Sequence, residues 1–458
     1  MLLVLLVTST AACASTSANP LAGIKITPGE GSVWIMLFNP VPDLRPAYAI
    51  ADWSERGRYV VDELHRVAKS AQADAQAQLD AAGIASVSYW AINGMSVEGP
   101  DALGRALGQL PGVAQVYAEP LHQVVTAPSL TPVAAPTAGT VPPSLTDLKV
   151  PEVWATGDRG AGVTVGFIDS GVDATHPALA PAYAGASSGG QPAAVDHDYH
   201  WFDATGECKD APCDADGHGT HVAGIVVGNA VGDTPAIGVA PEARWIAARA
   251  CKEGKGCTVR AILRAAQFML APTTRSGENP DPSRRPQVLN NSWELGNLDG
   301  SVDRLVKVWE AANIQPVFAA GNSGPACESV GDPSSTDAAM AVGAVDADGV
   351  ALPSSGRGAG INGLVKPDVV ARGESIVSTV PGGGWAAASG TSVAAPQVTG
   401  LVALALAAGA SPDQADDLIM RTAHALPVDG CGSSGQPNNT TGWGFPDAPA
   451  LVTASRKR

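Results

Sequence analysis

The chain has little charge, and most of it lacks any apolar stretch long enough to cross a membrane. Charged residues make up 16% of its 458 residues, whereas hydrophobic residues make up 45%. That balance supplies enough apolar surface for a large core and predicts folded domains rather than disorder. Beyond the N-terminus, no run reaches the roughly 18 unbroken apolar residues that a membrane span needs. A chain of this length predicts two or three domains.

Basic side chains are the scarcer of the two charged classes. The 28 Lys and Arg residues face 44 Asp and Glu residues, which leaves a net charge of -16 at pH 7. An acidic surface is repelled by phosphate backbones and by anionic lipids. We therefore expect neither nucleic acid nor an anionic membrane as a partner, and we expect no transmembrane segment.

Residues 1–19 lack a basic start but otherwise look like an export signal. Residues 2–7 read LLVLLV and precede small residues, as in the apolar segment and cleavage zone of a signal peptide. No Lys or Arg precedes Lys25, so the usual basic region is missing. Cys13 lies where a lipoprotein signal has its lipidated cysteine, although Thr10 stands where an aliphatic residue is usual. These features predict export, with a lipid anchor at Cys13 as an open alternative.

No two cysteines have the C-x-x-C spacing that is typical of zinc sites, so we expect disulfides rather than a metal. Besides Cys13, the chain has Cys208, Cys213, Cys251, Cys257, Cys327 and Cys431. An even number suits an oxidising compartment. Pairing the near neighbours at 208 and 213 and at 251 and 257 would leave Cys327 with Cys431. Six cysteines allow many other connectivities, and spacing does not choose among them.

Residues 30–123 combine strand and helix patterns in a small α/β unit. Strand-like runs and helical spacings alternate at residues 32–38, 59–82, 85–92, 95–97, 100–109 and 113–118. The resulting order of strand, helix, strand, strand, helix, strand is a split βαβ plan. Residues 124–144 follow; they are uncharged and rich in Pro, Ala and Thr. Such a composition predicts an exposed linker that is easily cut.

From residue 145 to residue 454 the pattern changes to alternating apolar strands and helices. The strand-like runs are residues 163–168, 245–250, 287–289 and 317–320, and the helical runs are residues 258–270, 301–312 and 393–408. This alternation predicts an α/β fold with a mostly parallel sheet and helices on both faces.

Three short segments carry side chains suited to chemistry. Asp169 ends an apolar strand, and catalytic groups in open α/β sheets gather at the carboxyl ends of strands. His218 precedes small residues and an apolar helical run, in which His221 has a packing role. Ser392 lies two residues after Gly390 and opens a helical run, whose backbone N–H groups and positive dipole end lie beside the hydroxyl. Pro396 would be tolerated there only in the first helical turn. Taken singly, each segment also has an ordinary structural interpretation, such as a turn cap or an N-cap.

Taken together, the segments resemble the subtilase family of serine proteases, whose order of Asp, His and Ser they share. The resemblance extends to Gly321-Asn322 and to residues 289–293 (LNNSW), 366–371 (KPDVVA) and 442–447 (GWGFPD). It covers about residues 145–454 and implies a subtilisin-like peptidase domain.

The resemblance implies a role for each matching residue. Ser392 is the nucleophile, His218 the general base and then acid, and Asp169 the group that orients the imidazole. The Asn322 side chain and the Ser392 backbone N–H bind the oxyanion. No cofactor is required for this chemistry. Calcium is common in the family, but no dense Asp/Asn loop assigns ligands, so no metal residue is named.

The substrate-binding residues implied by the resemblance are Ser292, Trp293, Glu294 and Gly331. The first three match the strand that pairs with a bound peptide, and Gly331 matches the floor of the first specificity pocket. The family usually has glycine at the position of Glu294. A carboxylate at the pocket rim would favour a basic substrate residue; the alternative is that Glu294 points to solvent.

Residues 30–123 resemble the inhibitor-like prodomain of the family through Pro111-Gly112-Val113, Val116 and Glu119. Such a unit assists folding and then blocks the site as an intramolecular inhibitor. The resemblance predicts a secreted, autoprocessed zymogen that is cut within residues 122–144 and acts on proteins or peptides.

Three other functions stay open. A catalytically silent protease-like binding protein would need a broken triad or a lost oxyanion donor, and all four residues are present. An acyl-transferring enzyme, or a processing protease with one target, would use the same serine.

Overall fold

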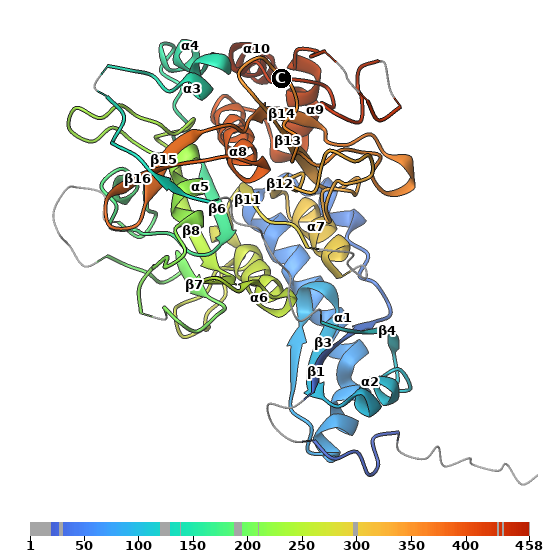
Figure 1. Ribbon diagram of the computed structural model, residues 1–458. Coiled ribbons are helices and arrows are strands. Elements are labelled where there is room, and N and C mark those ends of the chain that lie inside the picture. Colours follow the sequence, from blue (N-terminus) through green and yellow to red (C-terminus); the bar gives the residue numbers. More distant parts are fainter. Residues whose placement is uncertain are drawn as a thin grey trace, which may run out of the picture.

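A small N-terminal part and a larger α/β part form the molecule (Figure 1). The computed structural model describes residues 20–26, 31–119, 129–137, 139–186, 195–208, 210–295, 301–427, 430–432 and 435–457. The expected signal peptide at residues 1–19, with Cys13, lies outside the described residues.

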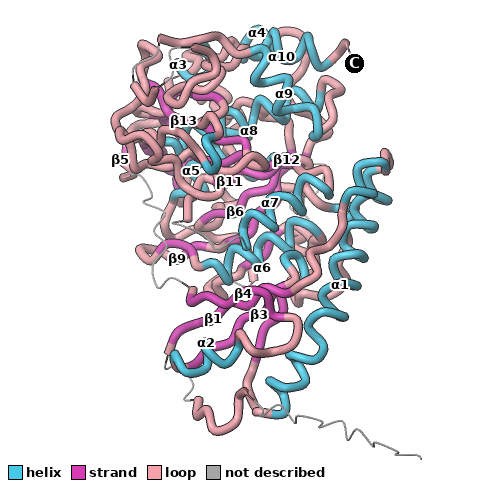
Figure 2. The backbone as a smooth tube through the Cα atoms, turned by 90° about the vertical axis from the view of Figure 1, so that its right-hand side faces the viewer, coloured by secondary structure: helices cyan, strands magenta, loops and turns pink. Residues whose placement is uncertain are grey.

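An antiparallel sheet of four strands with two helices makes up the N-terminal part (Figures 1 and 2). Its elements in chain order are β1 (Ser32–Phe38), α1 (Trp53–Ala81), β2 (Ser86–Tyr89), β3 (Gly94–Gly99), α2 (Asp101–Leu107) and β4 (Val113–Ala118). The order of elements predicted from the sequence is confirmed. Helix α1 begins earlier than its apolar spacing indicates, because the Asp52 side chain caps it and accepts a hydrogen bond from the Glu55 N–H at 2.8 Å.

A parallel sheet of seven strands, in the order β14-β13-β12-β11-β6-β8-β7, is the centre of the larger part. These strands are β6 (Thr164–Asp169), β7 (Trp201–Asp203), β8 (Arg244–Arg249), β11 (Val288–Asn291), β12 (Gln315–Ala319), β13 (Met340–Val345) and β14 (Val369–Arg372). The remaining short strands are β5 (Thr131–Pro132), β9 (Cys251–Lys252), β10 (Gly256–Cys257), β15 (Ile376–Val380) and β16 (Gly384–Ala388).

Helices cover both faces of this sheet, as the sequence predicts. The helices are α3 (Pro143–Asp147), α4 (Val150–Trp154), α5 (His218–Val227), α6 (Val259–Leu270), α7 (Ser301–Ala311), α8 (Thr391–Ala407), α9 (Pro412–Thr422) and α10 (Ala448–Ser455). Successive strand residues point to opposite faces. In β12, Val317 and Ala319 join the core under α5 and α8, whereas Phe318 joins the core under α6 and α7.

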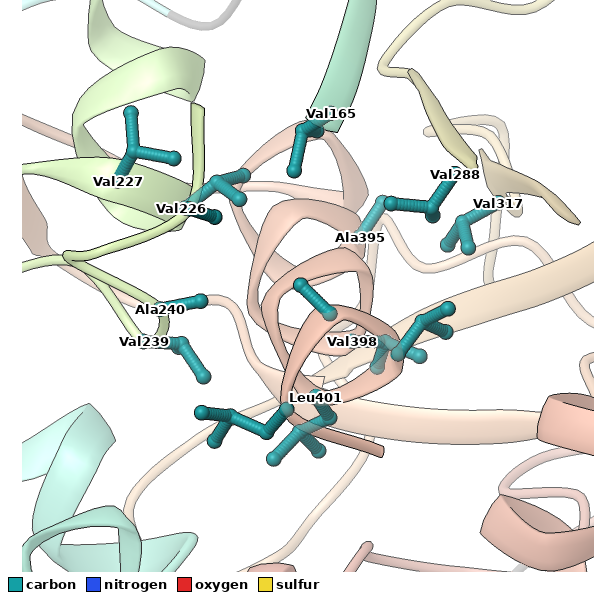
Figure 3. Close-up of a cluster of buried hydrophobic side chains, with 14 of the residues drawn as sticks. Val165, Val226, Val227, Val239, Ala240, Val288, Val317, Ala395, Val398 and Leu401 are labelled. Carbon is teal, nitrogen blue, oxygen red and sulfur yellow. The ribbon is translucent and has the colours of Figure 1, made fainter. Parts of the chain in front are cut away.

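Helix α8 runs through the middle of the first of these cores. Figure 3 shows its Ala395, Val398 and Leu401 among Val226 of α5 and Val165 of β6. Every residue from Thr391 to Ala405 is buried. The small side chains of this helix let strands and neighbouring helices approach it closely, so its first turn, which carries Ser392, is enclosed by the core.

The N-terminal part packs on α6 and α7, and one continuous apolar core joins the two parts (Figure 2). Polar contacts flank that core. The Glu119 carboxylate accepts hydrogen bonds from the Arg260 backbone N–H and from Arg260 Nε, both at 2.7 Å. Arg56 of α1 pairs with Asp413 of α9 at 2.7 Å. The N-terminal part therefore contacts the larger part both at α6 and at α9, on either side of the shared apolar core.

Part of the expected linker is a strand on the larger part. Thr131 and Pro132 pair antiparallel with Ala387 and Ala386 of β16. The preceding Leu130 packs against a small buried cluster that includes Val393, next to Ser392.

Three disulfides join Cys208 with Cys213, Cys251 with Cys257, and Cys327 with Cys431. This connectivity is the one reached by pairing the near neighbours first.

Within the part of the chain that the structure describes, no single helix is both long and apolar enough to cross a membrane. Helices α8 and α9 meet that test only when taken together, and they are bent by 115° relative to each other.

Candidate active site

Asp169 and His218 form a hydrogen-bonded pair inside the protein. His218 Nδ1 lies 2.7 Å from Asp169 Oδ1, and both residues are 3% exposed. A carboxylate only accepts hydrogen bonds, so Nδ1 carries the proton and Nε2 is the basic nitrogen of the neutral ring. Nε2 is buried and has no hydrogen-bond partner among the described residues. The pair thus presents an imidazole that is ready to accept a proton.

Asp214 and Ser170 hold the start of α5 against the end of β6. The buried Asp214 carboxylate accepts hydrogen bonds from Gly217 N–H at 2.8 Å, and from Thr220 N–H at 2.8 Å and Thr220 Oγ1 at 2.6 Å. Ser170 Oγ donates to the same carboxylate at 3.0 Å and accepts from Gly219 N–H at 2.9 Å. Sequence reasoning missed Asp214; its signal is a carboxylate shortly before a helix start, where free N–H groups need acceptors.

Close backbone packing at Gly219 brings His218 beside Asp169. A Cβ atom at Gly219 would lie 2.0 Å from the Gly171 carbonyl oxygen, which is far inside van der Waals contact. Only glycine therefore fits at the second position of α5. The small residues noted in the sequence have this physical purpose.

The pKa of His218 is raised above its ordinary value. Burial lowers it, but the charge of Asp169 and the hydrogen bond to it outweigh burial. His221 differs, because burial lowers its pKa to about 4. Its Nε2 lies 3.0 Å from the Ala386 carbonyl oxygen, which fits the expected packing role.

Ser392 is the second residue of α8 and is 2% exposed. Gly390 enters the helix with φ of 139°, a backbone conformation that side chains disfavour. In the first turn, the Ser392 N–H has no acceptor within the helix. The structure gives no hydrogen bond between Ser392 and His218 within the described residues. Such bonds are often long in enzymes without substrate and shorten in the complex.

Asn322 is oriented by the start of α8. The Thr391 backbone N–H and hydroxyl donate to Asn322 Oδ1 at 3.0 Å and 3.1 Å. A backbone N–H can only donate, so the atom that it meets is the amide oxygen. The Nδ2 group is thereby left to donate to another acceptor, beside the free N–H groups of α8.

Pro396 is the sixth residue of α8, so the expectation that proline is tolerated in this helix only in the first turn is wrong. Having no N–H, it leaves the Ser392 carbonyl without its helical donor. Ser292 Oγ donates to that carbonyl at 2.9 Å and accepts from Asn290 Nδ2 at 2.9 Å. The LNNSW segment therefore supports the backbone of Ser392.

The side chains of Ser292 and Trp293 are buried, at 0% and 1% exposure. Trp293 packs edge to face on Phe318 with ring centroids 5.2 Å apart. The Glu294 side chain lies over Gly331 and is half-buried rather than extended into solvent. Burial raises the pKa of Glu294, and the Asn322 N–H lowers it by less.

Two other segments noted in the sequence hold each other rather than the site. Lys366 Nζ donates to Asp368 Oδ2 at 2.7 Å, and Trp443 N–H donates to the Asp368 carbonyl at 2.7 Å. Asp447 caps α10 by accepting from Ala450 N–H at 2.8 Å. They stabilise the end of the sheet that carries β13 and β14.

Across the described ranges, no three His, Cys, Asp or Glu side chains are grouped to hold a metal ion. We therefore assign no calcium ligands.

Comparison with known proteins identifies a family and several similar proteins. The sequence model of the subtilase family matches residues 160–444. Bacillopeptidase F of Bacillus subtilis (strain 168) is 35% identical over 386 residues, which cover 80% of this chain and 26% of that protein. Subtilisin DY of Bacillus licheniformis is 34% identical over 274 residues, which cover 59% of this chain and 85% of that protein. Subtilisin-like protease PopC of Myxococcus xanthus (strain DK1622) is 32% identical over 317 residues, which cover 63% of this chain and 61% of that protein. The chain thus spans about a quarter of Bacillopeptidase F.

Ser292→Ala should destabilise the protein by about 1–3 kcal/mol, because the buried Ser392 carbonyl loses its donor. Pro396→Ala restores a helical N–H to that carbonyl and should offset part of the loss. Urea unfolding of the two single variants and the double variant, all in a Ser392→Ala background, measures the coupling. Strictly additive effects would show that Ser292 does not replace the missing N–H.

Asp169→Asn should lower the pKa of His218, because burial then acts without the opposing carboxylate. NMR titration of His218 in the Ser392→Ala background measures this pKa. Asp216→Asn, which removes a smaller contribution, is the control and should lower the pKa less. An unchanged pKa in Asp169→Asn would contradict the assigned cause.

The same shift predicts how stability depends on pH. With a raised pKa in the folded state, His218 stabilises the fold below about pH 6.5, and this stabilisation is lost as pH rises through the raised pKa. In Asp169→Asn, acidification should destabilise instead.

Proposed function

The chain belongs to the subtilase family of serine endopeptidases, and from this premise we propose that it is an exported endopeptidase, made as a zymogen, that cuts peptide bonds with Asp169, His218 and Ser392. The observation that carries the assignment of residues is the buried Asp169–His218 pair, whose Nε2 has no partner among the described residues.

In the proposed reaction, Ser392 Oγ attacks the carbonyl carbon of the peptide bond while His218 Nε2 takes the hydroxyl proton. The Asp169 carboxylate stabilises the imidazolium, consistent with the raised pKa of His218. The imidazolium then protonates the leaving amine as the C–N bond breaks. Water then attacks the acyl-enzyme while His218 Nε2 takes its proton. His218 returns that proton to Ser392 Oγ as the acid leaves.

Two donors would bind the oxyanion that forms in each half of the reaction. They are Asn322 Nδ2, whose orientation follows from the bonds of Thr391 to Oδ1, and the Ser392 N–H. Both belong to the start of α8 or contact it, where the helix dipole favours negative charge. The same site would bind substrate backbone along residues 292–294.

The N-terminal part would act as an intramolecular inhibitor and folding aid. Its α+β fold and its place before the family match agree with a prodomain. The described residues of the N-terminal part end at Glu119, whose carboxylate contacts the start of α6. The next described residue is 129. Leu130 lies beside Gly217, next to His218. Within the expected range of residues 122–144, we infer that the processing bond lies before Leu130, because the residues after Leu130 pair with β16.

Proteins or peptides would be the substrates, with no cofactor needed for the chemistry. Three disulfides favour an oxidising, extracytoplasmic location. Export through residues 1–19, and the alternative of a lipid anchor at Cys13, are part of the proposal.

The purified wild type should lose roughly its first 120–130 residues and react once with a serine-directed fluorophosphonate. Ser392→Ala should do neither. Ser389→Ala, three residues earlier, is the matched control and should process and label normally. Intact mass spectrometry reads both outcomes. A correctly folded wild type that stays full length and unlabelled would instead support the catalytically silent binding protein.

The mature protein should be found outside the cytoplasm with all six of its cysteines oxidised. Thiol-reactive mass labelling before and after reduction measures this. Mature protein inside the cell with free thiols would contradict export. A lipidated Cys13 on the precursor or on the N-terminal part released by processing would support the anchor.

A further inference from the structure

The Glu294 side chain contacts the backbone of Asn322, whose side chain is a proposed oxyanion donor. The Asn322 backbone N–H donates to Glu294 Oε1 at 3.3 Å. Two residues before Glu294, Ser292 bonds to the Ser392 carbonyl. Glu294 therefore borders the region that a substrate must enter to place its carbonyl between Ser392 and Asn322.

Two glycines make room for the Glu294 carboxyl group. A Cβ atom at Gly321 would lie 2.0 Å from Glu294 Oε2, and one at Gly331 would lie 2.1 Å from the same atom. The backbone is held in this register because Leu295 N–H donates to the Asp332 carbonyl at 2.9 Å. Any side chain at either glycine would displace the carboxyl group. The acidic tip is thus built into the wall that Gly321 and Gly331 form.

The carboxyl group has few partners where it lies. A carboxylate can accept about four hydrogen bonds, and among the described residues Glu294 accepts the one from Asn322. Burial disfavours its charged form and raises its pKa. An incoming cation would supply both the missing donors and the opposite charge.

The reach of a substrate side chain fits this position. The side chain of the residue whose carbonyl is attacked branches from the atom next to that carbonyl. It therefore starts within a few bonds of Ser392 and Asn322, and a long side chain extends several ångströms beyond. We propose that Glu294 selects peptides with Arg or Lys as the residue on the acyl side of the cut bond. This proposal rests on the proposed function.

Other substrate side chains would be less favourable at this site. A large apolar side chain would cover the carboxylate without giving it a donor, which is costly. A small side chain would leave the carboxylate without a partner. A glutamine side chain could donate hydrogen bonds but would carry no charge.

The proposed processing bond is not of the preferred kind. No Lys or Arg lies between Arg105 and Lys149. The first cut is intramolecular, however, and a tethered substrate has a high effective concentration that offsets a weaker side-chain contact. The preference is therefore expected for separate substrates.

The experiment measures kcat/KM of the processed enzyme on peptides that differ only at this residue, as Arg, Lys, Gln, Phe or Ala. Arg and Lys should exceed Gln by about 10-fold to 100-fold, the range for one charged hydrogen-bonded contact. Glu294→Gln, which keeps the shape, should reduce the Arg-to-Gln ratio to near one. Glu374→Gln, at an exposed carboxylate, is the control and should keep the ratio.

Each result decides the proposal. Normal fluorophosphonate labelling with no Arg or Lys advantage, or with the advantage kept in Glu294→Gln, overturns this inference and leaves the proposed function standing. A preference for Ala that shifts to Phe in Glu294→Gly would mean that the carboxyl group only fills space, which also overturns it. Loss of labelling in the wild type would overturn the proposed function itself.

A second measurement needs no variant. Benzamidine, a flat cation, and benzamide, its uncharged analogue, are compared as competitive inhibitors of the wild type. Benzamidine should bind about tenfold or more tightly. Equal inhibition constants would overturn the role of the charge even if Glu294 variants fail to fold.

Discussion

A carboxylate and an imidazole joined inside the protein constrain the whole of the larger part. Hydrogen bonds from His218 and from the Ser170 N–H to Asp169 Oδ1 offset part of the cost of burying this carboxylate. That pairing requires the start of α5 to touch the end of β6, and the touching requires glycine at position 219. The buried Asp214 then satisfies the N–H groups exposed at the helix start. The same few residues therefore provide the catalytic pair, the close packing of α5 on β6 and the hydrogen bonds at the helix start.

Helix α8 unites the core with the proposed nucleophile. Its small buried side chains let the sheet and α5 pack closely around it, as Figure 3 shows, which leaves its first turn little freedom to move. The same first turn carries Ser392 and orients Asn322 through Thr391. The cost is a carbonyl without a donor at Pro396, which Ser292 offsets from the neighbouring strand. A substitution deep in this helix would therefore change both stability and site geometry.

The further segments through which the sequence resembles the family have different structural roles. The segment around Ser292 supports Ser392 from β11 and ends at Glu294, beside Asn322. The segments around Asp368 and Trp443 bond to each other and stabilise a sheet end. The N-terminal part docks on α6 and α7 through an apolar core with flanking ion pairs. Apolar packing and ion pairs thus fix the N-terminal part on the face of the sheet that α6 and α7 cover.

By itself, the sequence determined the order of strands and helices in the N-terminal part, the parallel sheet with helices on both faces, and the family, because these depend on local periodicity and on short segments with fixed spacing. It also singled out Asp169, His218 and Ser392. Only the tertiary structure decided that Asp214 braces α5, that Pro396 is tolerated in the second turn, and where the Glu294 carboxyl group lies. Each of these depends on the packing of the folded backbone, and the last two on partners distant in the chain, such as Ser292 with Ser392 and Glu294 with Asn322 and Gly331. Contacts of that kind leave no periodic trace in the sequence, so they become visible only when the chain is folded.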